Sequence, residues 1–174
     1  EGDCLSTVFF RKEQFPVESA LDVAFQTASA FTAVNEISPV FGGITPRNIL
    51  LSARTNSEER VRVLNFFAPN AIEIVNTDPE FDATDYVSLP FASPETILGE
   101  KSDERSDVYS IGMLLYRMLA GEEPFPAKRI GTLLKPLMED PPPPLSSFRS
   151  DLPADLESVI LTALAKNPEM RYQT

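Results

Sequence analysis

The chain has 174 residues, of which 43% are hydrophobic, and it carries a formal net charge of −11. This length and composition fit one domain with a full hydrophobic core, and the negative charge argues against binding to the phosphate backbone of a nucleic acid. The sequence has no histidine and a single cysteine, which excludes histidine-based catalytic triads, nearly all zinc sites and an internal disulfide.

The first part of the chain predicts a short entry segment and one long helix. Residues 1–5 are expected to form a turn that leads into a short helix. Pro16 lies just inside a second helix that runs to about Val34, since proline is favoured at the first helical position. Apolar residues recur there at helical spacing and predict the buried face of this helix. They are Ala20, Leu21, Ala24, Phe25, Ala28 and Phe31.

A loop and a small β-hairpin are predicted next. Residues 35–46 contain two successive glycines and two prolines, which predict a loop. Two short apolar runs follow, at residues 48–51 and 61–64, and the polar stretch between them predicts a hairpin. From residue 65 to about residue 94 the pattern has no periodicity. We expect a long loop there, and loops of this length within a compact domain usually carry function.

Residues 106–120 form the most strongly patterned stretch of the sequence. Apolar side chains cover every face of a helix there, so we expect a buried central helix around which the chain is organised. The stretch is too short and too interrupted to span a membrane, which needs about 20 apolar residues. Gly121 and Pro124 are expected to end it. Asp107 places a carboxylate in the first turn, where free N–H groups favour an acid.

Two further helices are predicted after this one. Residues 127–140 have a helical pattern that Pro136 is expected to break, and Pro141–Pro144 should form a rigid connector. The last helix is expected to begin with Asp151 as its cap and Pro153 in its first turn. Together these elements predict one mainly α domain over residues 1–174, with a small β-hairpin. The buried stripe predicted for the last helix is Leu156, Val159, Ile160, Ala163 and Leu164.

Five short motifs occur in a defined order along the chain. In this order, with the predicted elements between them, they resemble the C-terminal lobe of a eukaryotic-like (Hanks-type) protein kinase, in its bacterial Ser/Thr form. The resemblance covers essentially the whole chain and implies that the family's N-terminal lobe is absent from it. The motifs are Phe41 to Leu51 at the catalytic loop, Asn65 to Phe67 at D-F-G, Ser88 to Glu95 at the end of the activation segment, Asp107 to Gly112 at the head of the central helix, and Asn167 to Arg171 at D-P-x-x-R.

The resemblance implies a structural role for residues that the chain retains. Asp107 is expected to hold backbone N–H groups of the catalytic loop. Glu95 is expected to pair with Arg171 in a partly buried ion pair. Phe66 stands at the phenylalanine of D-F-G, and Phe41 replaces the family's histidine with an apolar side chain of similar bulk.

At the chemical positions of the family the residues differ. Phosphoryl transfer needs an acid to orient the attacking hydroxyl, ligands for magnesium and a cation on the phosphate. The resemblance places Gly43 at the orienting aspartate, Thr45 at the lysine and Asn65 at the metal-binding aspartate, so no catalytic or metal-binding set remains. Asn48 alone matches its position, and we interpret Asn48 and Asn65 as remnants of a metal and nucleotide site. Their substitution is expected to change stability by less than about 1 kcal/mol.

These observations predict a catalytically inactive kinase-like domain, a pseudokinase, that acts as a protein-interaction or regulatory module. The expected partner is a protein, either an active kinase or another signalling protein, with no nucleic acid and no insertion of this segment into a membrane. Two alternatives stay open: an atypical kinase-like enzyme, and an ATP-binding switch, each completed by an N-terminal lobe. No cofactor is expected, although weak magnesium-independent ATP binding remains compatible with the sequence. The expected location is the cytoplasm, with the cytosolic part of a membrane-anchored protein as a variant.

Overall fold

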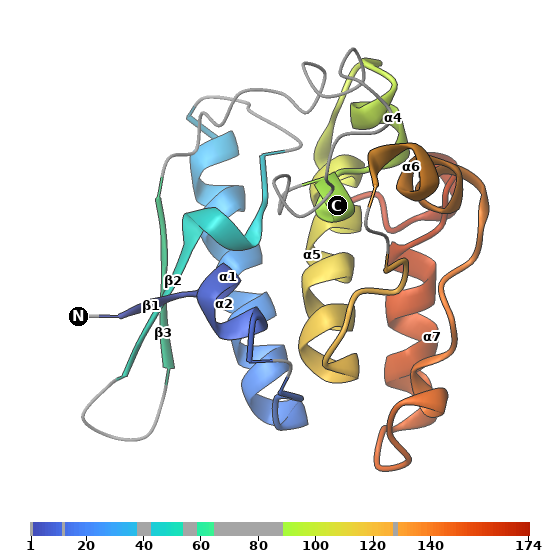
Figure 1. The fold of residues 1–174 in the computed structure, drawn as a ribbon. Helices are drawn as coiled ribbons and strands as arrows, with labels where there is room; N and C mark the ends of the chain where they lie inside the picture. The colour runs from blue at the N-terminus through green and yellow to red at the C-terminus, as the bar shows by residue number, and fades with distance from the viewer. Residues whose placement is uncertain (1, 12, 38–42, 54–58, 65–88, 127–128) are drawn as a thin grey trace.

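The computed structural model describes residues 2–11, 13–37, 43–53, 59–64, 89–126 and 129–174. Most of the loop predicted from residue 65 to about residue 94 lies outside these ranges. Figure 1 shows α5 between α2 and α7, and α5 contacts both of these helices. The elements in chain order are β1 (Asp3–Cys4), α1 (Leu5–Phe9), α2 (Val17–Asn35), η1 (Pro46–Asn48), β2 (Ile49–Ala53), β3 (Glu59–Val63), η3 (Leu89–Phe91), α4 (Pro94–Ile97), α5 (Glu104–Ala120), α6 (Ile130–Glu139), η4 (Leu145–Ser147), α7 (Ala154–Ala163) and η5 (Pro168–Met170), where η marks a 3-10 helix.

The sheet has three antiparallel strands in the order β1-β2-β3. The predicted hairpin is present as β2 and β3, which pair from Ile49 opposite Val63 to Ala53 opposite Glu59. The third strand, β1, was not predicted, because two residues are too short to show an alternating pattern and the strand exists only through its pairing with β2. The sheet packs on α2, and the backbone N–H of Val61 donates to the Gln26 side chain of that helix.

Helix α2 matches its predicted range to within one residue, and its predicted buried face is confirmed in part, at Ala20, Ala24 and Phe31. Leu21 and Phe25 are 41% and 71% exposed. The stripe drawn from sequence was too broad, because these two residues lie beside the arc that meets the sheet and α5 rather than within it. The residues that are buried are Ala20, Val23, Ala24, Thr27 and Phe31.

Helix α5 begins two residues earlier than predicted, because Asp103 caps it. The Asp103 side chain accepts from the N–H of Arg105, and the Ser106 hydroxyl accepts from the N–H of Asp103, which makes a capping box. Gly121 ends the helix in the left-handed conformation, with φ of 80°. Most residues of α5 from Ser106 onward are buried. Gly112 lets α7 approach closely, since a Cβ there would lie 3.0 Å from the Cβ of Ala163.

The structure corrects the prediction for α6. The helix runs from Ile130 to Glu139 and passes through Pro136 without a break. Leu133 and Leu137, on either side of the proline, are buried in a second apolar cluster, and this packing keeps the segment helical. The second cluster consists of Leu89, Ala92, Ile97, Phe125, Ile130, Leu133 and Leu137, and it is separate from the main core around α2 and α5.

Helix α7 also begins differently from the prediction. Pro153 is the N-cap residue, and the Asp151 side chain bonds Arg149 instead of capping the helix. Ile160, Ala163 and Leu164 are buried as predicted, and Leu156 is partly buried. Val159 is 45% exposed. Over the described residues, none of the helices is long and apolar enough to cross a membrane.

Candidate functional site

The candidate site begins at the loop that leads into β2. Asn48, the last residue of η1, is 5% exposed, and its side chain folds back onto the loop. Its Nδ2 donates to the carbonyl of Gly43 at 2.8 Å, and its Oδ1 accepts from the backbone N–H of Thr45 at 3.1 Å. Both ends of the amide therefore brace the loop between Gly43 and Asn48. The motif position of Asn48 indicates a remnant of a metal site, and no sequence pattern predicts this bracing role.

The braced loop contains few ionisable side chains. Gly43 has no side chain, and the Thr45 hydroxyl lies 3.4 Å from the Oδ1 of Asn48. Between Gly43 and Asn48 the sequence has no carboxylate, and its one cation, Arg47, is exposed. Within the described residues no three histidine, cysteine, aspartate or glutamate side chains are grouped so that they could hold a metal ion.

Three of the predicted site residues lie outside the described residues. These are Phe41, which precedes the braced loop, and Asn65 and Phe66 at the D-F-G position. Their predicted roles stay predictions.

Asp107 lies in the first turn of α5 and is 6% exposed. Its Oδ2 accepts a hydrogen bond from the Nδ2 of Asn35 at 3.0 Å. Asn35 is the last residue of α2, so this bond joins the end of α2 to the head of α5. Residues 38–42 of the catalytic loop lie outside the described residues, so the predicted contact of Asp107 with N–H groups of that loop stays a prediction.

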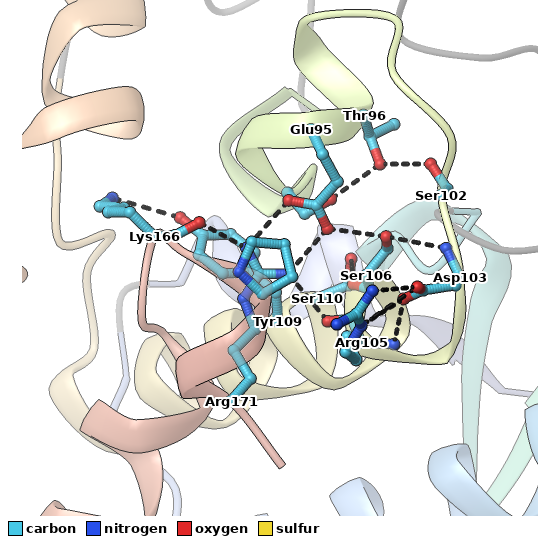
Figure 2. Close-up of polar contacts among 12 residues, drawn as sticks. Glu95, Thr96, Ser102, Asp103, Arg105, Ser106, Tyr109, Ser110, Lys166 and Arg171 are labelled. Atoms are coloured by element: carbon cyan, nitrogen blue, oxygen red, sulfur yellow. Dashed lines mark hydrogen bonds and ion pairs between the residues drawn. The ribbon is translucent and has the colours of Figure 1, made fainter. Parts of the chain in front are cut away.

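Glu95 and Arg171 form the ion pair that the sequence predicts. The Arg171 Nη1 and Nη2 donate to Glu95 Oε1 and Oε2 at 2.7 and 2.9 Å, as Figure 2 shows. The two side chains are 0% and 8% exposed, so the pair is buried. Burial alone would raise the pKa of Glu95, but hydrogen bonds from Arg171 and Ser106 outweigh it and hold the pKa below its usual value.

Every N–H of the Arg171 guanidinium is used, which explains how a charge can be buried there. Besides Glu95, the guanidinium donates to the backbone carbonyls of Ala165, Lys166 and Arg105 at 2.7, 2.9 and 3.0 Å. Its carbon atom lies 4.9 Å from the centre of the Tyr109 ring. A buried ion pair stabilises a fold only when its remaining donors are satisfied, and this one meets that condition.

An apolar groove of about 590 Å³ lies between α2, α5 and α7. Phe31, Ile111 and Val159 contribute to its walls, one from each helix, and Asp107 lies at its edge. Val159 is exposed because it faces this groove, although the periodicity of α7 places it on the apolar side.

A further polar residue with long-range contacts, Lys166, was not predicted from the sequence. It lies between α7 and η5, and its Nζ donates to the carbonyl of Leu137 in α6 at 2.7 Å. A single lysine after an apolar helix has no pattern that would predict such a contact.

Comparisons with known proteins place this geometry among the kinases. The family model for protein tyrosine and serine/threonine kinases matches residues 1–174. Serine/threonine-protein kinase PknB of Mycobacterium tuberculosis is 34% identical over 175 residues, which covers 100% of this chain and 27% of PknB. Serine/threonine-protein kinase pkn3 of Myxococcus xanthus is 31% identical, over 98% of this chain and 32% of that protein.

The fold is shared with solved structures. The kinase domain of Mycobacterium tuberculosis PknI matches with a TM-score of 0.68 at 22% sequence identity, over 100% of this chain and 58% of that one. A double mutant of the same domain matches with a TM-score of 0.69. The chain thus spans 27% and 32% of the length of the two curated relatives.

Proposed function

We propose that this chain, which belongs to the protein tyrosine and serine/threonine kinase family, is a pseudokinase C-terminal lobe that acts as a protein-interaction or regulatory module. It is a kinase-like domain related to bacterial Ser/Thr kinases. Its catalytic loop differs from theirs in lacking the acid and the cation that phosphoryl transfer uses, and the proposed role follows from this difference.

The composition of the catalytic loop carries this proposal. Kinase catalysis uses an aspartate of this loop to orient the substrate hydroxyl, and an asparagine to hold magnesium. The chain has Gly43 at the first position, and no carboxylate side chain lies in the braced loop that could replace it. Thr45 supplies no charge for the transferred phosphate. Asn48 remains, but its amide is engaged by the loop backbone.

The retained scaffold supports an interaction role. The ion pair of Glu95 with Arg171 joins α4 to the residue after η5, and the bond from Asn35 to Asp107 joins α2 to α5. A lobe that keeps these structural contacts but lacks the chemical groups is suited to binding a protein partner, such as an active kinase or another signalling protein. We propose the cytoplasm as its location, either alone or as the cytosolic part of a membrane-anchored protein.

One observation favours a second candidate, an ATP-binding switch. Asn48 keeps the position of the family's metal-binding asparagine, and one of the two bonds that its Oδ1 accepts, from the Thr45 hydroxyl at 3.4 Å, is long. An N-terminal lobe would have to complete such a site. An atypical kinase-like enzyme would need the same lobe, and in addition an acid from outside the braced loop.

A phosphate-transfer assay tests the main proposal. The full-length protein, including any segment upstream of Glu1, is incubated with radiolabelled ATP and either magnesium or manganese, with PknB as the positive control. We expect no incorporation above background. The triple variant Gly43→Asp, Thr45→Lys, Asn65→Asp restores the missing groups and serves as the matched comparison. Robust incorporation by the unmodified protein that Asn48→Ala abolishes would overturn the proposal.

A further inference from the structure

The C-terminal end of α6 is followed by a run of prolines, which have no N–H groups to donate to the last carbonyls of the helix. In a helix each carbonyl accepts from the N–H four residues later, and the last carbonyls need partners from elsewhere. The carbonyl of Leu137 would accept from residue 141, which is the first of four successive prolines and has no N–H. Leu137 is itself fully buried, so its carbonyl lies at an end of the helix that packs against the body.

Lys166 supplies the missing donor from a distant part of the chain. Its Nζ donates to the carbonyls of Leu137 at 2.7 Å and Pro136 at 3.3 Å. A cation at the C-terminus of a helix also interacts favourably with the helix dipole. The side chain comes from the segment between α7 and η5, so the contact ties α6 to the end of α7.

The same ammonium group contacts both apolar clusters. Nζ lies 4.6 Å from the centre of the Phe125 ring, which belongs to the second cluster. It lies 5.7 Å from the centre of the Tyr109 ring, which belongs to the main core, and 3.4 Å from the Tyr109 hydroxyl (Figure 2). Lys166 therefore contacts one aromatic residue of each cluster.

We propose that Lys166 is a latch that holds α6 against η3 and α4 at the second apolar cluster, and that α6 opens when the latch is released. Opening would expose Leu89 and Ile97 together with Leu133 and Leu137, which the closed state buries. The latch would thereby control access to an apolar surface. This inference does not depend on whether the domain transfers phosphate.

The charge of Lys166 gives the latch a defined dependence on pH. The pKa of Lys166 is lowered from 10.5 to about 8, chiefly by burial; the charge of Asp140 opposes this change and that of Arg171 adds to it. The other ionisable groups near it are Tyr109 on α5 and Glu95, which is paired with Arg171. In the open state the solvated lysine has its ordinary pKa near 10.5.

The sign of the effect follows from proton binding. Between about pH 8 and pH 10.5 the open state holds a proton that the closed state has lost, so opening becomes less favourable as pH rises. At most, the equilibrium constant for opening falls about tenfold for each unit by which the pH rises. Below about pH 8 both states are protonated and the dependence disappears.

Hydrogen exchange followed by mass spectrometry tests the latch in the intact chain. Lys166→Met keeps the aliphatic stem and removes the donor, so we expect protection of residues 130–139 to fall by about tenfold or more while α5 is unchanged. Lys135→Met is the matched control, because Lys135 is an exposed lysine on α6 itself. Lys166→Arg keeps donors and charge, so α6 should stay protected but lose its pH dependence between pH 8 and 10.

Three results would each overturn the proposal. One is unchanged protection of α6 in Lys166→Met. Another is an equal loss of protection in α5 and α6, which would mean that α6 does not open separately. The third concerns the pH dependence between pH 8 and 10. The proposal fails if the protection of α6 in the unmodified protein does not change over this range, or if Lys166→Arg shows the same change. The third result remains accessible even if Lys166→Met does not fold.

Discussion

Arg171 and Glu95 meet in a buried two-bond ion pair that joins the residue after η5 to the first turn of α4, 76 positions earlier in the chain. Ser106 on α5 donates to the same carboxylate at 2.7 Å. The pair therefore connects three elements that have no backbone hydrogen bonds in common. This makes it the clearest point at which to test how the domain is held together.

Loss of either partner should destabilise the domain strongly. Glu95→Ala and Arg171→Ala should each cost about 3–5 kcal/mol of unfolding free energy, because the remaining charge is buried without its partner. The double variant should cost much less than the sum of the two. Urea melts of the three variants measure this coupling. Glu169→Ala, which removes the exposed partner of Arg105, is the control and should cost less than about 1 kcal/mol. Additive losses at Glu95 and Arg171 would show that the pair is not coupled.

Acid should remove the contribution of Glu95. The folded-state pKa of Glu95 lies below its ordinary 4.5, so its charge stabilises the fold above that value, and this contribution is lost as pH falls through the folded-state pKa. The unfolding free energy of the unmodified protein should exceed that of Glu95→Gln by a constant amount near pH 7. Below about pH 4.5 the difference should shrink. A difference that does not change between pH 7 and pH 3 would contradict the assigned cause of the pKa shift.

The structure changes the expectation for Asn48. From sequence we expected less than about 1 kcal/mol for its removal, as for a residue outside the core. The buried amide braces Gly43 and Thr45, and Asn48→Ala leaves their backbone groups without these partners, so the loss should be about 1–3 kcal/mol. Thr45→Ala removes the hydroxyl that lies 3.4 Å from the same amide and takes part in the capping box of η1, but it leaves both bonds of the Asn48 amide to the loop backbone, so it should cost less. Equal urea midpoints for Asn48→Ala and the unmodified protein would instead show that the amide contributes little to stability, as the sequence alone predicts.

Asp107 should contribute to the junction of α2 and α5. Asp107→Ala should cost about 1–3 kcal/mol, because Asn35 loses a buried acceptor. Asn35→Ala should reproduce only part of this loss if Asp107 also holds catalytic-loop N–H groups, as its family position implies. Thermal melts of both variants distinguish the two cases. The same loss in both would mean that Asn35 accounts for the whole role of Asp107.

Nucleotide binding should be weak and almost independent of magnesium. Asn48 is engaged by its own loop, and the sequence has asparagine in place of the metal-binding aspartate at residue 65, so a metal ion would lack an anionic ligand. Calorimetric titration of the full-length protein with ATP, with and without magnesium, measures this. Micromolar affinity that requires magnesium would instead favour the ATP-binding switch.

Much of the site was predictable because its signals are local or lie in short motifs. The apolar residues on all faces of residues 106–120 predicted α5, and Gly121 predicted its end. The paired charges of Glu95 and Arg171 were identified through their motifs, although they are far apart in sequence. The sequence alone shows that residue 43 has no side chain and that residue 45 carries no charge, because this concerns which residues are present and not where they lie.

Tertiary structure decided the features that depend on what lies opposite a residue. Strand β1 exists because β2 offers it an edge, and α6 continues through Pro136 because the second cluster buries both sides of it. The bracing role of Asn48 and the cap that Lys166 places on Leu137 arise from contacts between groups whose sequence carries no periodic signal. Periodicity reports which face of an element is apolar, but only the packed chain determines which partner each polar group finds.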